Sequence, residues 1–197
     1  MKYIYTICFL LLIGSTNSFA QDLKFGFDYR MAAPLAEQGD YISKTSFSGA
    51  GFYMISEKTE NLSFTFDIGY NFFYEKENKN TYEFGTISLT GVQYRYITTV
   101  PITAGVNYTF MPESSIKPYI GLGAGFVYNQ LRLDMGLYNI QDEIWKFMVK
   151  PEVGILFALN PNFDLKFSSN YNKSVFNSDE YPVTYLNYNI GFVSRIH

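Results

Sequence analysis

The segment from Leu62 to Tyr74 reads LSFTFDIGYNFFY, and every second residue in it, counted from Leu62, is apolar. Successive side chains of an extended strand point to opposite faces, so these seven residues share one face. The opposite face is mostly small or polar, with Phe73 as the exception. A soluble sandwich would bury the apolar face, whereas a membrane barrel would expose it to lipid. Other features of the chain favour lipid.

The N-terminal segment has the pattern of a secretory signal peptide. Lys2 gives a basic start, Ile4 to Ile13 form an apolar run, and Ser18 to Ala20 place small residues at a cleavage site. An uncleaved membrane helix is the alternative, but the run is shorter than the roughly 20 apolar residues that span a bilayer. We therefore predict a signal peptide at residues 1–20, which directs the chain across the inner membrane, and one barrel domain at residues 21–197.

The composition excludes several kinds of site. The only cysteine is Cys8, inside the predicted signal peptide, so the mature chain offers no disulfide, thiolate metal site or cysteine nucleophile. The 15 basic and 18 acidic side chains form no basic stripe, and we expect no nucleic-acid partner. The 18 tyrosines and 19 phenylalanines favour strands and the aromatic belts of membrane interfaces.

Alternation and turn signals predict eight strands, an even number, as a single-chain bacterial barrel requires. Several exceed the roughly 9 to 11 residues that a tilted membrane strand needs. The second alternates least clearly, and its glycines could instead mark a bulge. The predicted strands are Leu23–Ala32, Thr45–Ser56, Leu62–Tyr74, Gln93–Phe110, Lys117–Leu131, Trp145–Leu159, Phe163–Lys173 and Thr184–Ile196. The expected fold is an all-β, eight-stranded antiparallel up-and-down transmembrane β-barrel.

The connections between these strands alternate in length. The odd ones are long, at residues 33–44, 75–92, 132–144 and 174–183, and the even ones are short, at residues 57–61, 111–116 and 160–162. Outer-membrane barrels pair long outer loops with short periplasmic turns. This asymmetry predicts location in the outer membrane, where the expected partners are the surrounding lipid and the barrel insertion machinery.

The inward positions of the predicted strands collect acids and bases. A barrel of eight strands is just wide enough for its side chains to fill, and buried charges need partners. We therefore predict a plugged lumen, with a charge-lined channel as the alternative. The predicted lumen network comprises Asp28, Arg30, Asp67, Arg95, Lys150, Glu152, Asp164 and Lys166, with Lys24 and Arg195 also inward.

Two consecutive segments, YRYITTVPITAGVNYTF at Tyr94–Phe110 and IKPYIGLGAGFVYN at Ile116–Asn129, carry a family resemblance. They resemble the outer membrane protein beta-barrel domain family and, more distantly, the OmpA, OmpW and opacity-type small barrels. The resemblance implies the barrel fold and assigns no chemistry. The chain departs from the family in ending with Ile196 and His197 rather than an aromatic residue. Pro101 cannot donate to the strand ladder, so we expect a bulge there.

The sequence offers little for catalysis. Small barrels that are enzymes resemble one another in using a histidine, and the only histidine here is His197, on the predicted periplasmic side. The acid pairs Asp142–Glu143 and Asp179–Glu180 are too few to bind a hard cation, which takes six or more oxygens. We expect no catalytic site, no metal and no cofactor.

The expected function is a structural or surface-interaction role carried by the outer loops, with the protein acting as a monomer on an unidentified extracellular or envelope partner. A narrow channel for small or hydrophobic solutes and a lipid-modifying envelope enzyme are the alternatives. The loop at residues 132–144 is unusually apolar. Either it forms a contact surface, or it extends the flanking strands and covers the barrel mouth. The candidate contact residues are Leu133, Met135, Leu137, Tyr138 and Ile140.

Overall fold

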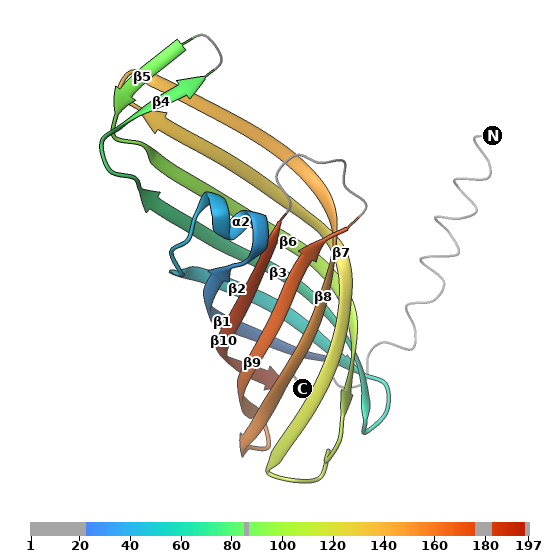
Figure 1. Cartoon of the computed structure of the whole chain (residues 1–197). Coiled ribbons are helices and arrows are strands. Elements are labelled where there is room, and N and C mark those ends of the chain that lie inside the picture. The colour runs from blue at the N-terminus through green and yellow to red at the C-terminus, as the bar shows by residue number, and fades with distance from the viewer. Residues whose placement is uncertain (1–22, 85–86, 176–182, 196–197) are drawn as a thin grey trace, which may run out of the picture.

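Eight strands close into an antiparallel barrel in the computed structural model, which describes residues 23–84, 87–175 and 183–195. Each strand pairs with its neighbours along the chain, and β1 pairs with β10 to close the ring (Figure 1). The predicted fold is confirmed, while the predicted signal peptide lies outside the described residues. The strands are β1 (Leu23–Pro34), β2 (Ser46–Glu57), β3 (Leu62–Lys76), β6 (Tyr94–Thr109), β7 (Ile116–Met135), β8 (Tyr138–Asn160), β9 (Phe163–Ser174) and β10 (Thr184–Arg195).

Two of the long connections carry structure of their own. Helix α2 (Ala36–Tyr41) lies between β1 and β2, and a hairpin of β4 (Asn80–Phe84) and β5 (Ile87–Gly91) lies between β3 and β6. Both sit at the end of the barrel opposite the short turns (Figure 1). Within the described residues, no helix has the length and apolar character needed to cross a membrane.

The third long connection is not a loop, and this prediction was wrong. β7 and β8 stay paired from Ile116–Phe157 up to Met135–Tyr138, with only Gly136 and Leu137 between them. Gly136 has a φ of 60°, and a two-residue hairpin turn needs such positive φ values. Except for Gly136 and Leu137, the residues predicted as a loop belong to β7 and β8, so the hairpin continues beyond the ends of β1, β2, β9 and β10, with β6 paired alongside it as far as Tyr94–Asp134 (Figure 1).

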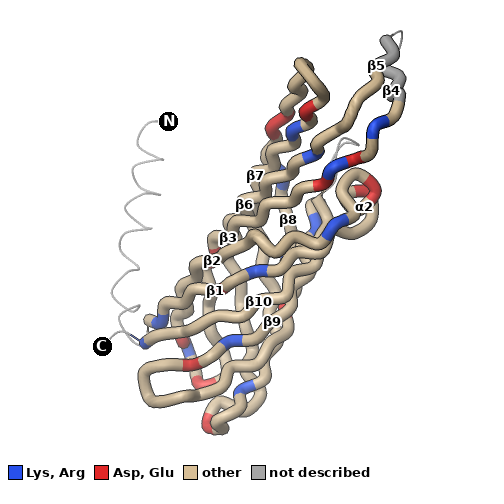
Figure 2. The backbone as a smooth tube through the Cα atoms, turned by 90° about the vertical axis from the view of Figure 1, so that its left-hand side faces the viewer, with Lys and Arg blue, Asp and Glu red and all other residues tan. Residues whose placement is uncertain are grey.

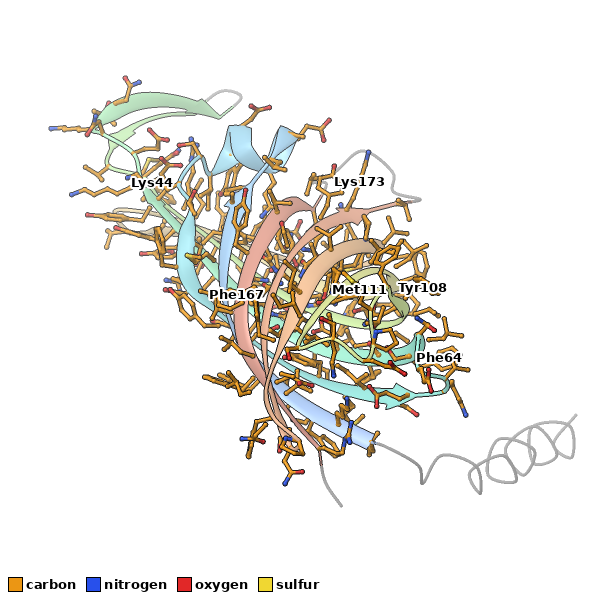
Figure 3. All side chains as sticks on the ribbon, turned by 90° about the horizontal axis from the view of Figure 1, so that it is seen from below. Lys44, Phe64, Tyr108, Met111, Phe167 and Lys173 are labelled. Atoms are coloured by element: carbon orange, nitrogen blue, oxygen red, sulfur yellow. The ribbon has the colours of Figure 1, made fainter. Side chains whose placement is uncertain are left out.

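The outward face follows the predicted alternation. Leu62, at the start of β3, is half-buried, and the outward residues that follow it along β3 are exposed or half-buried, while the residues between them point into the barrel. Phe64, Tyr108 and Met111 lie near one another in the view from below, on the side away from Lys44 and the β4–β5 hairpin (Figure 3). Apolar side chains thus surround the barrel wall, as lipid requires.

The outward residue pairs of β7 and β8 show which part of these strands lies within the membrane. Outward pairs are apolar from Ile116–Phe157 up to Tyr128–Trp145, whose rings lie 5.4 Å apart. The next outward pair, Gln130–Glu143, is polar. Residues 116–128, at about 3.3 Å each and a tilt of roughly 45°, rise about 30 Å, which is the thickness of the hydrocarbon layer. The part of the hairpin beyond Tyr128 therefore stands outside the membrane.

The predicted bulge at Pro101 is absent. β3 and β6 pair in one unbroken register, from Ile68–Ile102 below to Asn71–Thr99 above, although the two intervening pairs are missing. A missing amide donor therefore interrupts the ladder without adding a residue. A register shift occurs instead where β1 and β2 pair, between Arg30–Gly49 and Ala32–Ser46. The irregular second strand does contain a bulge, next to its glycines.

Glycines on the lumen face make room for the largest inward side chains. A Cβ at Gly51 would lie 1.9 Å from Arg30 Nη2, and one at Gly26 would lie 2.1 Å from the Tyr53 ring. Arg30 cannot withdraw, because its guanidinium is 2% exposed and held by two carboxylates. At Gly123, by contrast, an added Cβ would meet nothing closer than Lys150 Cε at 3.5 Å.

Gly51→Ala should therefore destabilise the barrel by about 1–3 kcal/mol, the usual cost of overpacking. Gly123→Ala, the same change elsewhere on the lumen face, should stay within about 0.5 kcal/mol of the parent. Urea unfolding of the refolded protein in lipid vesicles measures both. Equal stability of the two variants would show that the lumen is loosely packed around Arg30.

Candidate functional site

Arg30 is the centre of the charge network inside the barrel. Its Nε donates to Asp28 Oδ1 over 2.6 Å, and its Nη1 and Nη2 both donate to the carboxylate of Asp67. All three side chains are 4% exposed or less. Two planar carboxylates thus match the forked guanidinium, which is the strongest geometry for a buried ion pair.

The network continues from Asp67 across the lumen to two more strands. Lys150 Nζ lies 2.9 Å from Asp67 Oδ1 and 3.9 Å from Glu152, and Lys166 Nζ lies 2.9 Å from Glu152 Oε1. The Tyr119 hydroxyl also donates to Glu152. Three acids and three bases therefore alternate from Asp28 to Lys166, and the buried group has no net charge (Figure 2 shows the charged positions along the tube).

Two of the eight predicted lumen residues lie outside this group. Asp164 lies nearer the short turns, 3.9 Å from Lys24, whose main partner is Glu57 at 2.6 Å. The placement of Arg95 in the network was wrong. Arg95 points inward but lies at the outer mouth, where it donates to the Tyr41 carbonyl and approaches Glu77 at 3.5 Å.

An apolar layer lies above the charge network, and the sequence reasoning missed it. It joins side chains from six strands and from the segment that follows α2. The signal was present, since Phe73 interrupts the polar face of the third strand. Its members are Ala32, Ile42, Phe73, Ile97, Val127, Leu131, Met148, Val183 and Tyr185.

The connection that contains α2 is fastened over this apolar layer by polar contacts. The Thr184 amide donates to Gln38 Oε1 over 2.8 Å, and the Ser43 amide donates to Glu75 Oε2 over 2.6 Å. The Arg95 guanidinium stacks on the Tyr41 ring at 5.1 Å. The lumen is thus closed by charge at membrane depth and by apolar packing with a helical cover at the outer mouth.

Two small cavities lie within the described part of the lumen. One of about 20 Å³ lies among Asp67, Lys150, Glu152 and Lys166, and one of about 30 Å³ lies nearer the short turns, beside Tyr119. Each has room for about one water molecule. Neither provides a passage for a hydrated solute.

The five candidate contact residues divide into two groups. Met135 is 4% exposed and Leu133 is half-buried, so these two are not free surface. Leu137, Tyr138 and Ile140 are exposed by 102%, 59% and 56%. Three apolar side chains therefore stand in water at the tip of the β7–β8 hairpin.

The outward face of the same hairpin is polar and internally bonded. Gln130 and Gln141 donate to Glu143 Oε1 over 3.1 and 2.7 Å. Hydrogen bonds from Tyr128 and from these two amides lower the pKa of the exposed Glu143 carboxyl. The Arg132 guanidinium lies 4.4 Å from the Tyr96 ring centroid. This face is suited to water and to headgroups above the aromatic belt.

Several residues considered for chemistry cannot be placed. His197, Asp179 and Glu180 lie outside the described residues, and Asp142 and Glu143 are both exposed. The described part of the chain contains no group of three or more His, Cys, Asp or Glu side chains that could hold a metal ion.

The model of the outer membrane protein beta-barrel domain family matches residues 6–195. The chain belongs to this family. The match covers nearly the whole sequence, and it places the protein in the outer membrane. The family resemblance found in the Tyr94–Phe110 and Ile116–Asn129 segments is therefore confirmed. No protein of curated function matches the sequence.

Solved structures of other small outer-membrane proteins share the fold. Ail, the attachment invasion locus protein of Yersinia pestis, solved in complex with the heparin analogue sucrose octasulfate, is 14% identical with a TM-score of 0.55, covering 89% of this chain and 97% of Ail. Neisserial surface protein A is 15% identical with a TM-score of 0.51, covering 89% and 95%. The Escherichia coli outer membrane protease OmpT is 8% identical with a TM-score of 0.51, covering 92% and 99%. At these identities the likeness shows the barrel fold alone.

The charge network leads to a stability prediction. Asp67→Asn removes the carboxylate shared by Arg30 and Lys150 and leaves buried positive charge without its partner, so it should cost about 3–5 kcal/mol. Adding Lys150→Met should recover part of that loss, because the two side chains are in contact.

Asp134→Asn is the matched control, because its ion pair with Arg132 is exposed and should be worth less than about 1 kcal/mol. Urea unfolding in vesicles measures all three variants. If Asp67→Asn were no more costly than Asp134→Asn, the lumen would have to admit enough water to solvate the remaining charges.

Proposed function

We propose that this protein is a closed barrel that acts at the cell surface as an interaction protein, through the tip of the β7–β8 hairpin. The observation that carries the proposal is the exposure of Leu137, Tyr138 and Ile140 above the membrane. Exposed apolar groups that cluster above a polar surface are typical of contact sites. The function therefore resides in a rigid hairpin rather than in a flexible loop.

The alternative use of these residues, covering the barrel mouth, accounts for only part of the set. Met135 is buried and approaches Gly91 at the end of β5, where an added Cβ would lie 3.3 Å from Met135 Cγ. The mouth itself is covered by the segment around α2. The three exposed tip residues contribute nothing to that cover, which favours their use in binding.

The edge of the hairpin supports the same proposal. β8 pairs with β9 only from Met148–Ser174 downward, and among the described residues Tyr138 to Trp145 pair with β7 alone. An exposed strand edge offers its backbone donors and acceptors to an added strand. An extended segment of a partner could therefore bind backbone to backbone while its side chains contact the apolar tip.

The barrel itself gives no support to transport or catalysis. The small lumen cavities and the neutral network favour a closed barrel over a narrow channel, and the described residues contain no histidine to serve as a base. We propose a monomer surrounded by lipid and inserted by the barrel machinery, since the ring is closed and offers no unpaired strand edge at membrane depth.

Purified protein in planar bilayers should show no large, steady conductance, because charge pairs and an apolar layer close the lumen in series. A porin reconstituted in parallel serves as the positive control. A stable conductance of porin size would contradict the closed barrel and favour the channel.

Bacteria that display the protein should adhere better to a protein-coated surface, or to one another, than bacteria without it. The triple variant Leu137→Ser, Tyr138→Ser, Ile140→Thr should lose most of this gain while remaining heat-modifiable on gels. The control variant Asn139→Ser, Gln141→Ser changes the outward side of the same tip and should keep it. Equal adhesion by the apolar variant and the parent would exclude the tip as the contact site.

A further inference from the structure

A pocket of about 260 Å³ opens at the periplasmic mouth of the barrel, the end with the short turns. Its charged walls come from four different strands: Lys24 of β1, Lys117 of β7, Asp164 of β9 and Arg195 of β10. The end of β8 and the turn that follows it complete the pocket, with Ala158, Asn160, Pro161 and Asn162. The pocket is separate from the outer hairpin and from the closed network at membrane depth.

The charges that the described residues place around this pocket do not balance. Lys24 Nζ lies 2.6 Å from Glu57 Oε1 and 3.9 Å from Asp164 Oδ2, and Arg195 Nη2 approaches the same Glu57 at 3.8 Å. Lys117 makes no ion pair with any described residue, and Arg195 Nε is buried with no described hydrogen-bond partner. Among the described side chains, three bases thus face two acids.

The network at membrane depth, where three bases meet three acids, provides the contrast. Unmatched cations are costly where they are partly buried, unless an anion completes the set. The two incompletely paired bases, Lys117 and Arg195, line the same pocket. A guanidinium is suited to oxyanions because its parallel N–H groups match two oxygens of a carboxylate or phosphate.

We propose that the periplasmic mouth is a binding site for an oxyanion group, phosphate or carboxylate, held by Arg195 and Lys117 with Lys24 behind them. The pocket can hold one such group with its surrounding atoms. The group can belong to a headgroup of the inner leaflet, which lies at this height, or to a free anion of the periplasm. The site does not depend on the proposed surface function, because the closed lumen separates the two ends.

Inorganic phosphate, titrated into isotope-labelled protein refolded in maltoside detergent, tests the proposal by NMR. Saturable shifts are expected at the amides of Asn160 and Asn162 and at the Arg195 side chain. Arg195→Gln and Lys117→Gln should each weaken binding about ten-fold, the value of one hydrogen bond to a charged group. Lys173→Gln, which removes the same charge at the opposite end, should leave binding unchanged.

The parent protein alone can overturn the proposal, whether or not the variants fold. Absence of saturable shifts at the mouth, in detergent and in lipid discs, would exclude the site, as would equal weakening by Lys173→Gln. Shifts present in phosphatidylglycerol discs before phosphate is added would assign the oxyanion to the headgroup. Shifts that appear only with added phosphate would assign it to a free anion.

Discussion

The bidentate contact of Arg30 with Asp67, completed by Asp28, is the interaction on which the rest of the lumen depends. The Arg30 side chain, at 2% exposure, must be surrounded by acceptors, which fixes the positions of β1 and β3 relative to each other. It must also have space, and Gly51 and Gly69 supply it: a Cβ at either would lie within 2.3 Å of the guanidinium. The ion pairs of Arg30 and the glycines beside it are thus both needed to place this side chain in the lumen.

The space that Arg30 needs explains why the irregular second strand has glycines at its lumen positions. Its lumen positions Gly49 and Gly51 could not carry side chains without displacing Arg30 or its neighbours. The bulge lies just above Gly49, where β2 places two residues, Phe47 and Ser48, against one residue of β1. The next large lumen residue of β2, Tyr53, is accommodated in turn by Gly26 across the β1–β2 pair. Lys166 Nζ lies 4.1 Å from the centroid of the Tyr53 ring, which joins Tyr53 to the charge network.

Alternation was enough to predict the strands, the closed fold and most inward charges, because period-two patterning decides which face each residue occupies. Three features were beyond it. Arg95 lies in the inward half of the alternation, as a lumen residue does. Alternation does not give a residue's position along the barrel axis, and that position decides which partners Arg95 reaches. The loop at residues 132–144 was predicted from alternation and turn signals, which ended the flanking strands at Leu131 and Trp145, although Gly136 marks a two-residue turn. The apolar layer joins residues from six strands, which only the closed ring brings together.

The outer boundary of the membrane explains the apolar layer and the exposed tip together. At membrane depth the outward face is apolar and the lumen carries the charge network; the apolar layer begins just below the Tyr128–Trp145 pair, with Val127 and Met148, and above that pair the outward face of the hairpin is polar. There Gln130 and Arg132 point outward, while Ile97 and Leu131 point into the mouth. The sheet is continuous through this level, so only its surroundings change, from lipid to water.

A strand that leaves the bilayer follows the ordinary rule of a soluble sheet, with one apolar face that must be covered. The cover around α2 reaches the lower part of that face and Met135 is buried near β5, but Tyr138, Ile140 and the turn residue Leu137 extend beyond both. The hairpin therefore carries more apolar surface than its own fold buries, and that excess is the physical basis for proposing the tip as a contact site.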